Sequence, residues 1–156
     1  MQLLRSLVLT LAGAGILWYL LWTRPPGPGP VVDARLKPAL IDWMVDMRDL
    51  GLDVKWRYGR LDWILVESSS HLAGHSDPGS GTLMVSEQAL SQGPWTAKAV
   101  LYHELGHYIF GLNHTDEISI MYRENLPEDY YRENWPELLN DYLTQCKNNG
   151  HELKFR

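Results

Sequence analysis

The spacing of apolar residues predicts a first amphipathic helix over residues 33–51. Apolar positions recur three or four residues apart, which places them on one face of a helix, and Gly51 follows as a residue that readily ends one. These positions are Leu36, Leu40, Trp43, Met44, Met47 and Leu50. We therefore expect one face of this helix to pack against a core.

Alternation of apolar and polar residues in the next segments predicts β-structure. Residues 52–58 alternate, a Gly-Arg pair supplies a turn, and an apolar run resumes at residues 63–66, so we interpret the two segments as a hairpin. Residues 68–81 have the composition of a loop. Thr82–Ser86 is expected to form a third short strand.

Two further helices are expected after a Gly-Pro break at residues 93–94. The first covers an apolar stretch that begins at Trp95. The second begins near residues 134–137, which look like a capped helix start, and its apolar face makes Cys146 a core thiol. The pattern as a whole predicts an α+β fold with a small, twisted mixed sheet and a C-terminal helix.

The N-terminus has the pattern of a membrane helix. Residues 3–22 are apolar apart from Arg5, Ser6 and Thr10, and twenty helical residues span roughly 30 Å, the thickness of a bilayer core. We expect an uncleaved anchor over residues 1–23 and a single-pass membrane protein. A cleavable signal peptide is the alternative, because residues 12–14 form an A-x-A triplet.

A proline-rich and glycine-rich linker at residues 24–32 separates this anchor from one domain at residues 33–156. We expect the domain on the extracytoplasmic side. Basic residues flank both ends of the apolar segment, so the positive-inside rule does not itself decide the orientation.

Composition and charge exclude several classes of protein. The chain is 45% hydrophobic, too apolar for a disordered protein. All 19 acidic residues lie at or after Asp33, whereas two of the 14 basic residues, Arg5 and Arg24, precede it. The domain therefore has no basic excess with which to bind nucleic acid. A single cysteine excludes a disulfide-stapled scaffold, and no pattern indicates an oligomeric state.

The segment that carries chemistry is the H-E-x-x-H motif at residues 103–107. On a helix, His103 and His107 lie one turn apart on the same face, where both imidazoles can bind one Zn²⁺. Glu104 lies beside them, where it can act on a metal-bound water. The motif also occurs by chance, but here it stands in an apolar helix and is followed by a glycine and a third histidine.

A catalytic zinc needs a third protein ligand, and His114 is the candidate. Gly111 can adopt the left-handed conformation that ends a helix and turns the chain back towards the metal. Asp116, Glu124 and Glu128 are the alternative third ligands. The sequence thus predicts one catalytic Zn²⁺ held by His103, His107 and His114, with Glu104 as the catalytic residue.

These residues resemble the metzincin clan of zinc endopeptidases, and the matrixin-type members most. The clan's motif is H-E-x-x-H-x-x-G-x-x-H, followed by a methionine-containing turn, here residues 119–122. This chain has one extra residue between His107 and Gly111. Because one helical residue adds about 100 degrees of rotation, the turn must absorb it, and Asn113 tolerates the left-handed geometry that could help.

The resemblance implies a membrane-anchored endopeptidase that hydrolyses peptide bonds in a protein or peptide substrate. Glu104 would serve as general base, Met121 would pack beneath the ligands, and Tyr122 could assist the oxyanion. Thr82–Ser86 would be the edge strand that pairs with substrate. Matrixins also carry structural ions upstream of the active helix, so His71, His75 and Asp77 are candidates for a second metal site.

Two other functions stay open. A membrane-tethered binding module could keep the zinc for structure without cleaving peptides, although the intact Glu104 argues against it. Alternatively, the motif is accidental and the domain binds no metal.

Overall fold

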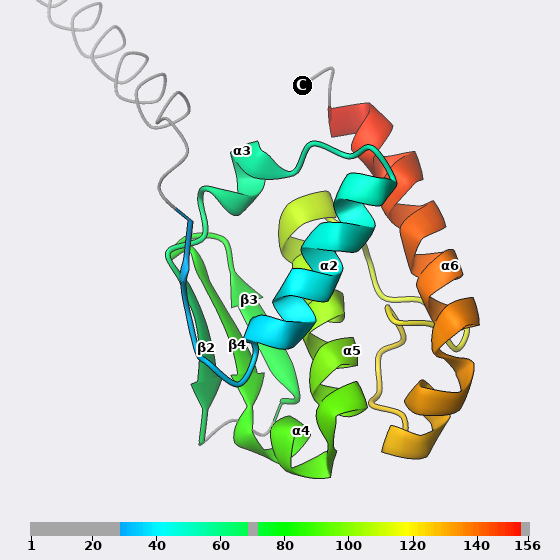
Figure 1. Cartoon of the computed structure of the whole chain (residues 1–156). Coiled ribbons are helices and arrows are strands. Elements are labelled where there is room, and N and C mark those ends of the chain that lie inside the picture. The colour runs from blue at the N-terminus through cyan, green and yellow to red at the C-terminus, as the bar shows by residue number, and fades with distance from the viewer. Residues whose placement is uncertain (1–28, 69–71, 154–156) are drawn as a thin grey trace, which may run out of the picture.

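The computed structural model describes residues 29–68 and 72–153, and it has an α+β fold with a small mixed sheet (Figure 1). This confirms the expected class. The elements in chain order are β1 (Val31–Val32), α2 (Lys37–Asp49), α3 (Lys55–Tyr58), β2 (Trp63–Glu67), β3 (Gly74–Asp77), β4 (Thr82–Ser86), α4 (Glu87–Gln92), α5 (Pro94–Leu105), a π-helical segment η1 (Gly106–Phe110) and α6 (Glu128–Leu153).

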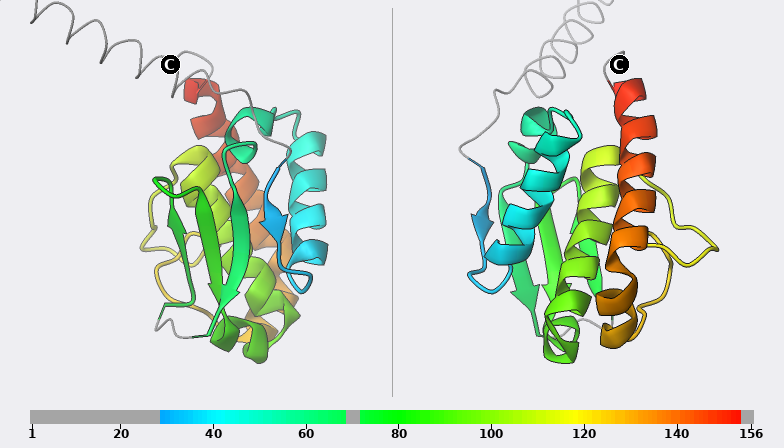
Figure 2. Two further views of the ribbon diagram at one scale, coloured as in Figure 1. Left: turned by 90° about the vertical axis from the view of Figure 1, so that its left-hand side faces the viewer. Right: turned by 45° about the vertical axis from the view of Figure 1, so that its right-hand side comes forward.

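The four described strands lie in the order β1, β2, β4, β3. β1 and β4 pair with β2 in parallel, whereas β3 pairs antiparallel with β4. The sheet therefore begins at Val31 and Val32, which the sequence analysis assigns to the linker. Figure 2 shows α2 and α5 side by side on one face of the sheet, with α6 packed against α5. The core fills the space between the sheet and these helices.

Aromatic residues join the three large helices within the core. Trp43 on α2, Tyr102 on α5 and Tyr142 on α6 are fully buried. The indole N–H of Trp43 donates to the Tyr142 hydroxyl at 3.1 Å, and that hydroxyl donates to the Tyr102 carbonyl at 2.8 Å. Met44 of the predicted apolar face is exposed. Cys146 is buried, as expected of a core thiol, and burial raises its pKa to about 12.

The expected hairpin is wrong, because residues 55–58 form the short helix α3 rather than a strand. The Asp53 carboxylate accepts a hydrogen bond from the Lys55 amide, and the Tyr58 amide donates to the Val54 carbonyl at 2.9 Å. These local bonds satisfy the backbone, and both sides of β2 are already paired with β1 and β4. An antiparallel neighbour for β2 has no free edge to occupy.

The predicted loop at residues 68–81 contains a strand, β3, whose four residues are Gly, His, Ser and Asp. These residue types are not typical of strands, so pairing with β4 accounts for the extended conformation of this segment. Thr82–Ser86 is confirmed as a strand, but it lies between β2 and β3. The expectation that it forms the sheet edge is therefore wrong, and β3 is the edge strand instead.

The C-terminal helix begins at Glu128, earlier than expected, and contains Pro136 within it. Proline removes one helical hydrogen bond, to the carbonyl four residues earlier. The Asn134 side chain does not cap a helix start and instead donates to the Tyr130 carbonyl at 2.9 Å. The ring of Trp135 packs between those of Trp95 and Tyr102. This packing offsets the lost bond and keeps the helix continuous.

The expected membrane anchor, residues 3–22, lies outside the described residues. Within the described part of the chain, no helix combines the length and the hydropathy that crossing a bilayer requires.

The N-terminus of α5 is closed by a side chain from the start of α6. The Glu128 carboxylate accepts hydrogen bonds from the Trp95 amide at 3.1 Å, the Thr96 amide at 2.7 Å and the Thr96 hydroxyl at 3.0 Å. A carboxylate at this position satisfies amides that have no partner within the helix and complements its dipole. Gly93 leaves room for it, since a Cβ there would lie 2.4 Å from the Glu128 Cδ.

We expect Glu128→Ala to lower the free energy of unfolding by about 1–2 kcal/mol, because two helix-terminal amides lose their acceptor. Asp129→Ala is the matched control, since Asp129 also lies in the first turn of α6 but only pairs with exposed Arg132. Chemical denaturation monitored by tryptophan fluorescence measures both. Equal stability of the two variants would contradict the capping role.

Candidate metal centre

His103 and Glu104 stand on α5, the most deeply buried helix among the described residues, whereas His107 lies in η1 and His114 in the loop that follows. Leu101, Tyr102 and Leu105 of α5 are fully buried, and Thr96 near its start is as well. Packing on several sides holds the helix between the sheet, α2 and α6. His103 and Glu104 occupy its last turn. Side chains on such a helix have little freedom to move.

The extra residue of the motif is absorbed by a π-helical segment, η1, directly after α5. The Gly111 amide donates to the carbonyls of Gly106 and His107, and the Leu112 amide donates back to Gly106 at 3.2 Å. This wider winding takes up one residue. Gly111 then ends the helix in the left-handed region, with φ of 65°. Asn113 does not share this role, because no described non-glycine residue has positive φ.

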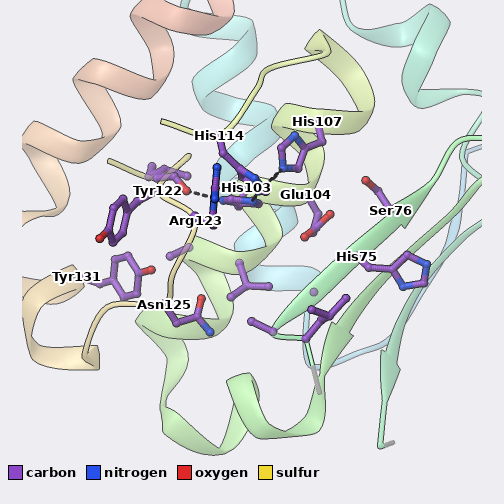
Figure 3. A pocket seen from close by; sticks show the side chains of 16 residues that line it. His75, Ser76, His103, Glu104, His107, His114, Tyr122, Arg123, Asn125 and Tyr131 are labelled. Atoms are coloured by element: carbon purple, nitrogen blue, oxygen red, sulfur yellow. Dashed lines mark hydrogen bonds between the residues drawn. The ribbon is translucent and has the colours of Figure 1, made fainter. Parts of the chain in front are cut away.

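The chain beyond Gly111 brings His114 to the two helical histidines. The Nε2 atoms of His103 and His107 lie 3.0 Å apart, and His114 Nε2 lies 3.1 Å from each. Figure 3 shows the three rings converging. The predicted ligands His103, His107 and His114 are therefore close enough to hold one metal ion.

Two backbone carbonyls set the tautomers of the helical histidines. His103 Nδ1 lies 2.7 Å from the Ile120 carbonyl, and His107 Nδ1 lies 2.6 Å from the Leu112 carbonyl. A carbonyl can only accept, so each Nδ1 carries a proton, which leaves Nε2 as the nitrogen available to a metal ion. Burial lowers the pKa of His103 to about 4 and favours the neutral ring. Converging lone pairs repel unless a cation lies between them, so this donor set fits a metal ion.

Glu104 lies next to the three ligands without belonging to the group. Its side chain is buried, and this burial raises its pKa to about 7, while a hydrogen bond from the Ser76 hydroxyl opposes part of the shift. A cation bound beside it would also favour the charged carboxylate. Gly74 on β3 permits this close approach, because a Cβ there would lie 2.9 Å from the Glu104 Cγ.

The histidines and Glu104 face an open pocket of about 390 Å³. β3 forms one wall, and the chain after Met121 forms another (Figure 3). The wall residues that the sequence analysis missed are Gly74, Ser76, Arg123, Asn125 and Tyr131. Ser76 and Gly74 could not have been found without predicting β3, whereas Arg123 follows directly on the residues singled out as the methionine turn.

Met121, which the resemblance places beneath the ligands, packs against Gly106, the residue before His107. It is fully buried, and a Cβ on Gly106 would lie 2.8 Å from its sulfur. The Thr115 amide donates to the Met121 carbonyl at 3.0 Å, which returns the chain after His114 to this floor. The same turn presents the Ile120 carbonyl to His103. Tyr122 lines the pocket, so its role at an oxyanion stays a prediction.

The alternative ligands do not join this group. Asp116 and Glu124 are exposed, and Glu128 caps α5. His71, one of the three candidates for a second metal site, lies outside the described residues. Asp77 accepts a hydrogen bond from the Gly79 amide at 2.9 Å and so closes the β3–β4 turn. Among the described residues, neither His75 nor Asp77 belongs to a group able to hold a metal.

Comparison of the chain with protein-family models, with curated proteins and with solved structures found no match.

We expect the purified full-length chain to bind about one divalent metal ion per molecule. His103→Ala, His107→Ala and His114→Ala should each weaken this binding more than about 100-fold. Removing a ligand should cost more metal affinity than removing the group that is hydrogen-bonded to it. His75→Ala is the control, since its ring lies outside the group of three. Metal analysis after dialysis gives the stoichiometry. Unchanged binding by the His114 variant would show that the third ligand is misassigned.

Gly106→Ala should destabilise the fold by about 1–2 kcal/mol, because the added methyl group collides with the buried Met121 sulfur and outweighs the helix propensity of alanine. Gly150→Ala in α6 provides the comparison, since its nearest neighbour is the end of the Leu52 side chain at 3.2 Å. Urea denaturation measures both. A Gly106 variant as stable as wild type would mean that the Met121 side chain can move aside at no cost in stability.

Proposed function

We propose that the domain is a zinc-dependent endopeptidase of the metzincin type, similar to matrixins. The observation that carries this proposal is the convergence of three imidazoles beside a buried carboxylate in an open pocket. Together these groups provide what hydrolysis of an unactivated amide needs: a metal site with room for water and a base within reach of it.

The donor set fits zinc. Three imidazole nitrogens 3.0 to 3.1 Å apart can all contact one ion at the usual Zn–N distance of roughly 2.0–2.1 Å. Three protein ligands leave a fourth position open, which is the arrangement of catalytic rather than structural zinc sites. When bound, zinc supplies Lewis acidity that polarises a carbonyl and makes water a nucleophile near neutral pH.

The residues of the chain supply the proton transfers. Glu104 is held on α5 beside the ligands, where it can accept a proton from the attacking water and donate it to the leaving amine. The Ser76 hydroxyl orients the carboxylate, and burial keeps bulk water from exchanging freely with it.

The edge position of β3 supports an extended peptide as substrate. β3 pairs with β4 along one side only among the described strands, and it lines the pocket at residues 74–76. A peptide can add to such an edge through main-chain hydrogen bonds and present a peptide bond to the metal. In this proposal β3 takes the role that the sequence analysis gave to Thr82–Ser86.

The membrane helix belongs to the proposal as well. Residues 3–22 would anchor the domain as a single-pass protein, which the pattern of apolar residues supports, and the active site would lie on the extracytoplasmic side.

Glu104→Gln tests the catalytic assignment. The amide keeps the size of the side chain but cannot accept the proton, so we expect retained zinc and a fall in kcat of about 10²-fold to 10⁴-fold on casein or a quenched peptide library. Glu117→Gln, an exposed glutamate on the segment after His114, serves as the control and should leave the rate unchanged.

The outcomes separate the possible functions. Equal cleavage by wild type and the Glu104 variant would exclude this mechanism. A wild type that holds zinc but cleaves no peptide would favour the non-catalytic zinc module, and a wild type that holds no metal would mean that the motif is accidental.

A further inference from the structure

One wall of the metal pocket carries a permanent positive charge. Arg123 directly follows the methionine turn and lines the pocket across from β3. His114 and Glu104 line the same pocket, so Arg123 shares this space with the candidate ligands.

No ion pair between described residues includes Arg123. By contrast, Arg35, Arg48 and Arg132 each pair with a carboxylate, and Arg57 donates to the Ile109 carbonyl. Glu104, the carboxylate that lines the same pocket, is buried and hydrogen-bonded to Ser76. Arg123 thus places an uncompensated cation at the mouth of a site in a protein of net negative charge.

We propose that Arg123 is a specificity residue that selects substrates with a carboxylate close to the scissile bond. This inference rests on the proposed function and narrows its substrate class to acidic peptides. Arginine suits this role because its planar guanidinium can donate two parallel hydrogen bonds to one carboxylate. The carboxylate can belong to an Asp or Glu side chain or to the C-terminus of the peptide.

Matched peptides test the proposal and distinguish the two sources. One series is capped at both ends and places Asp at each of the positions within three residues of the cleaved bond, with Asn as the isostere. A second series ends in a free carboxylate or in an amide at the same positions. We expect one position at which the carboxylate raises kcat/KM about 5-fold to 10-fold, and this preference should decline with added salt.

Arg123→Gln should abolish the preference, so that the carboxylate peptide and its Asn or amide counterpart are cleaved with equal kcat/KM, and Arg123→Glu should reverse it in favour of a peptide with Lys at that position. Arg132→Gln is the control, since Arg132 is exposed and paired on α6. Metal analysis and denaturation of each variant show whether the fold and the centre are intact. A carboxylate preference that survives in Arg123→Gln, or no preference in wild type, would overturn the inference.

A binding measurement keeps this test separate from the proposed catalysis. The same peptides are titrated onto zinc-loaded Glu104→Gln protein and onto the Glu104→Gln, Arg123→Gln double variant. The carboxylate peptides should bind about 5-fold to 10-fold more tightly, and only to the protein with Arg123. Equal binding to both proteins, or none to either, overturns the inference even where cleavage follows the predictions for Glu104.

Discussion

The site depends on the requirement that three imidazole lone pairs point at one place. Imidazoles do not gather in this way on their own, because neutral rings with facing lone pairs repel each other and cationic rings repel more strongly. Backbone carbonyls enforce the arrangement at two of them. The Ile120 carbonyl holds His103, and the Leu112 carbonyl holds His107. Each hydrogen bond fixes the rotation of a ring and places its proton on the nitrogen that faces away from the centre.

Both carbonyls come from the chain that follows α5, so the path of that chain determines the site. The segment η1 widens the helix by one residue, and Gly111 reverses its direction in the left-handed region. Leu112 is thereby returned over His107, and the turn at residues 119–122 is returned under His103. An α-helical exit of the same length would leave Gly111 rotated by about 100 degrees and His114 directed away from the other two rings. The π-helical winding is therefore what reconciles the longer spacing with a three-histidine centre.

The sequence was sufficient to predict the parts of this structure that local geometry decides. The first helix, Thr82–Ser86 and the grouping of three histidines follow from spacing and residue type, and the resemblance to metzincins drew attention to Met121. The failures share one physical cause, which is that long-range pairing overrode local preference. Residues 52–58 alternate like a strand but have no free edge to pair with, whereas β3 lacks strand-forming residues and is ordered by β4. Pro136 lies inside α6 because Trp135 is held between two aromatic rings of α5. Nothing in the sequence indicated the π-helical winding of η1 except the extra residue between His107 and Gly111.

The same packing that defines the core makes the candidate centre rigid. α5 contacts the sheet, α2 and α6, and these contacts hold the helix that carries His103 and Glu104. α6 supplies Glu128 to the start of α5 and Tyr142 to its far end. β3 brings Ser76 to Glu104, with Gly74 allowing the approach. Met121 fills the space that Gly106 leaves open. Because His103 and His107 stand on this packed helical stretch, two of the three candidate ligands are held in place before any ion binds, and less of the free energy of metal binding would be spent on ordering the chain. The pocket wall after Met121 is different, because Arg123, Glu124 and Asn125 are exposed. His103 and Glu104 on the packed helix and the exposed wall after Met121 are thus carried by separate segments of the chain.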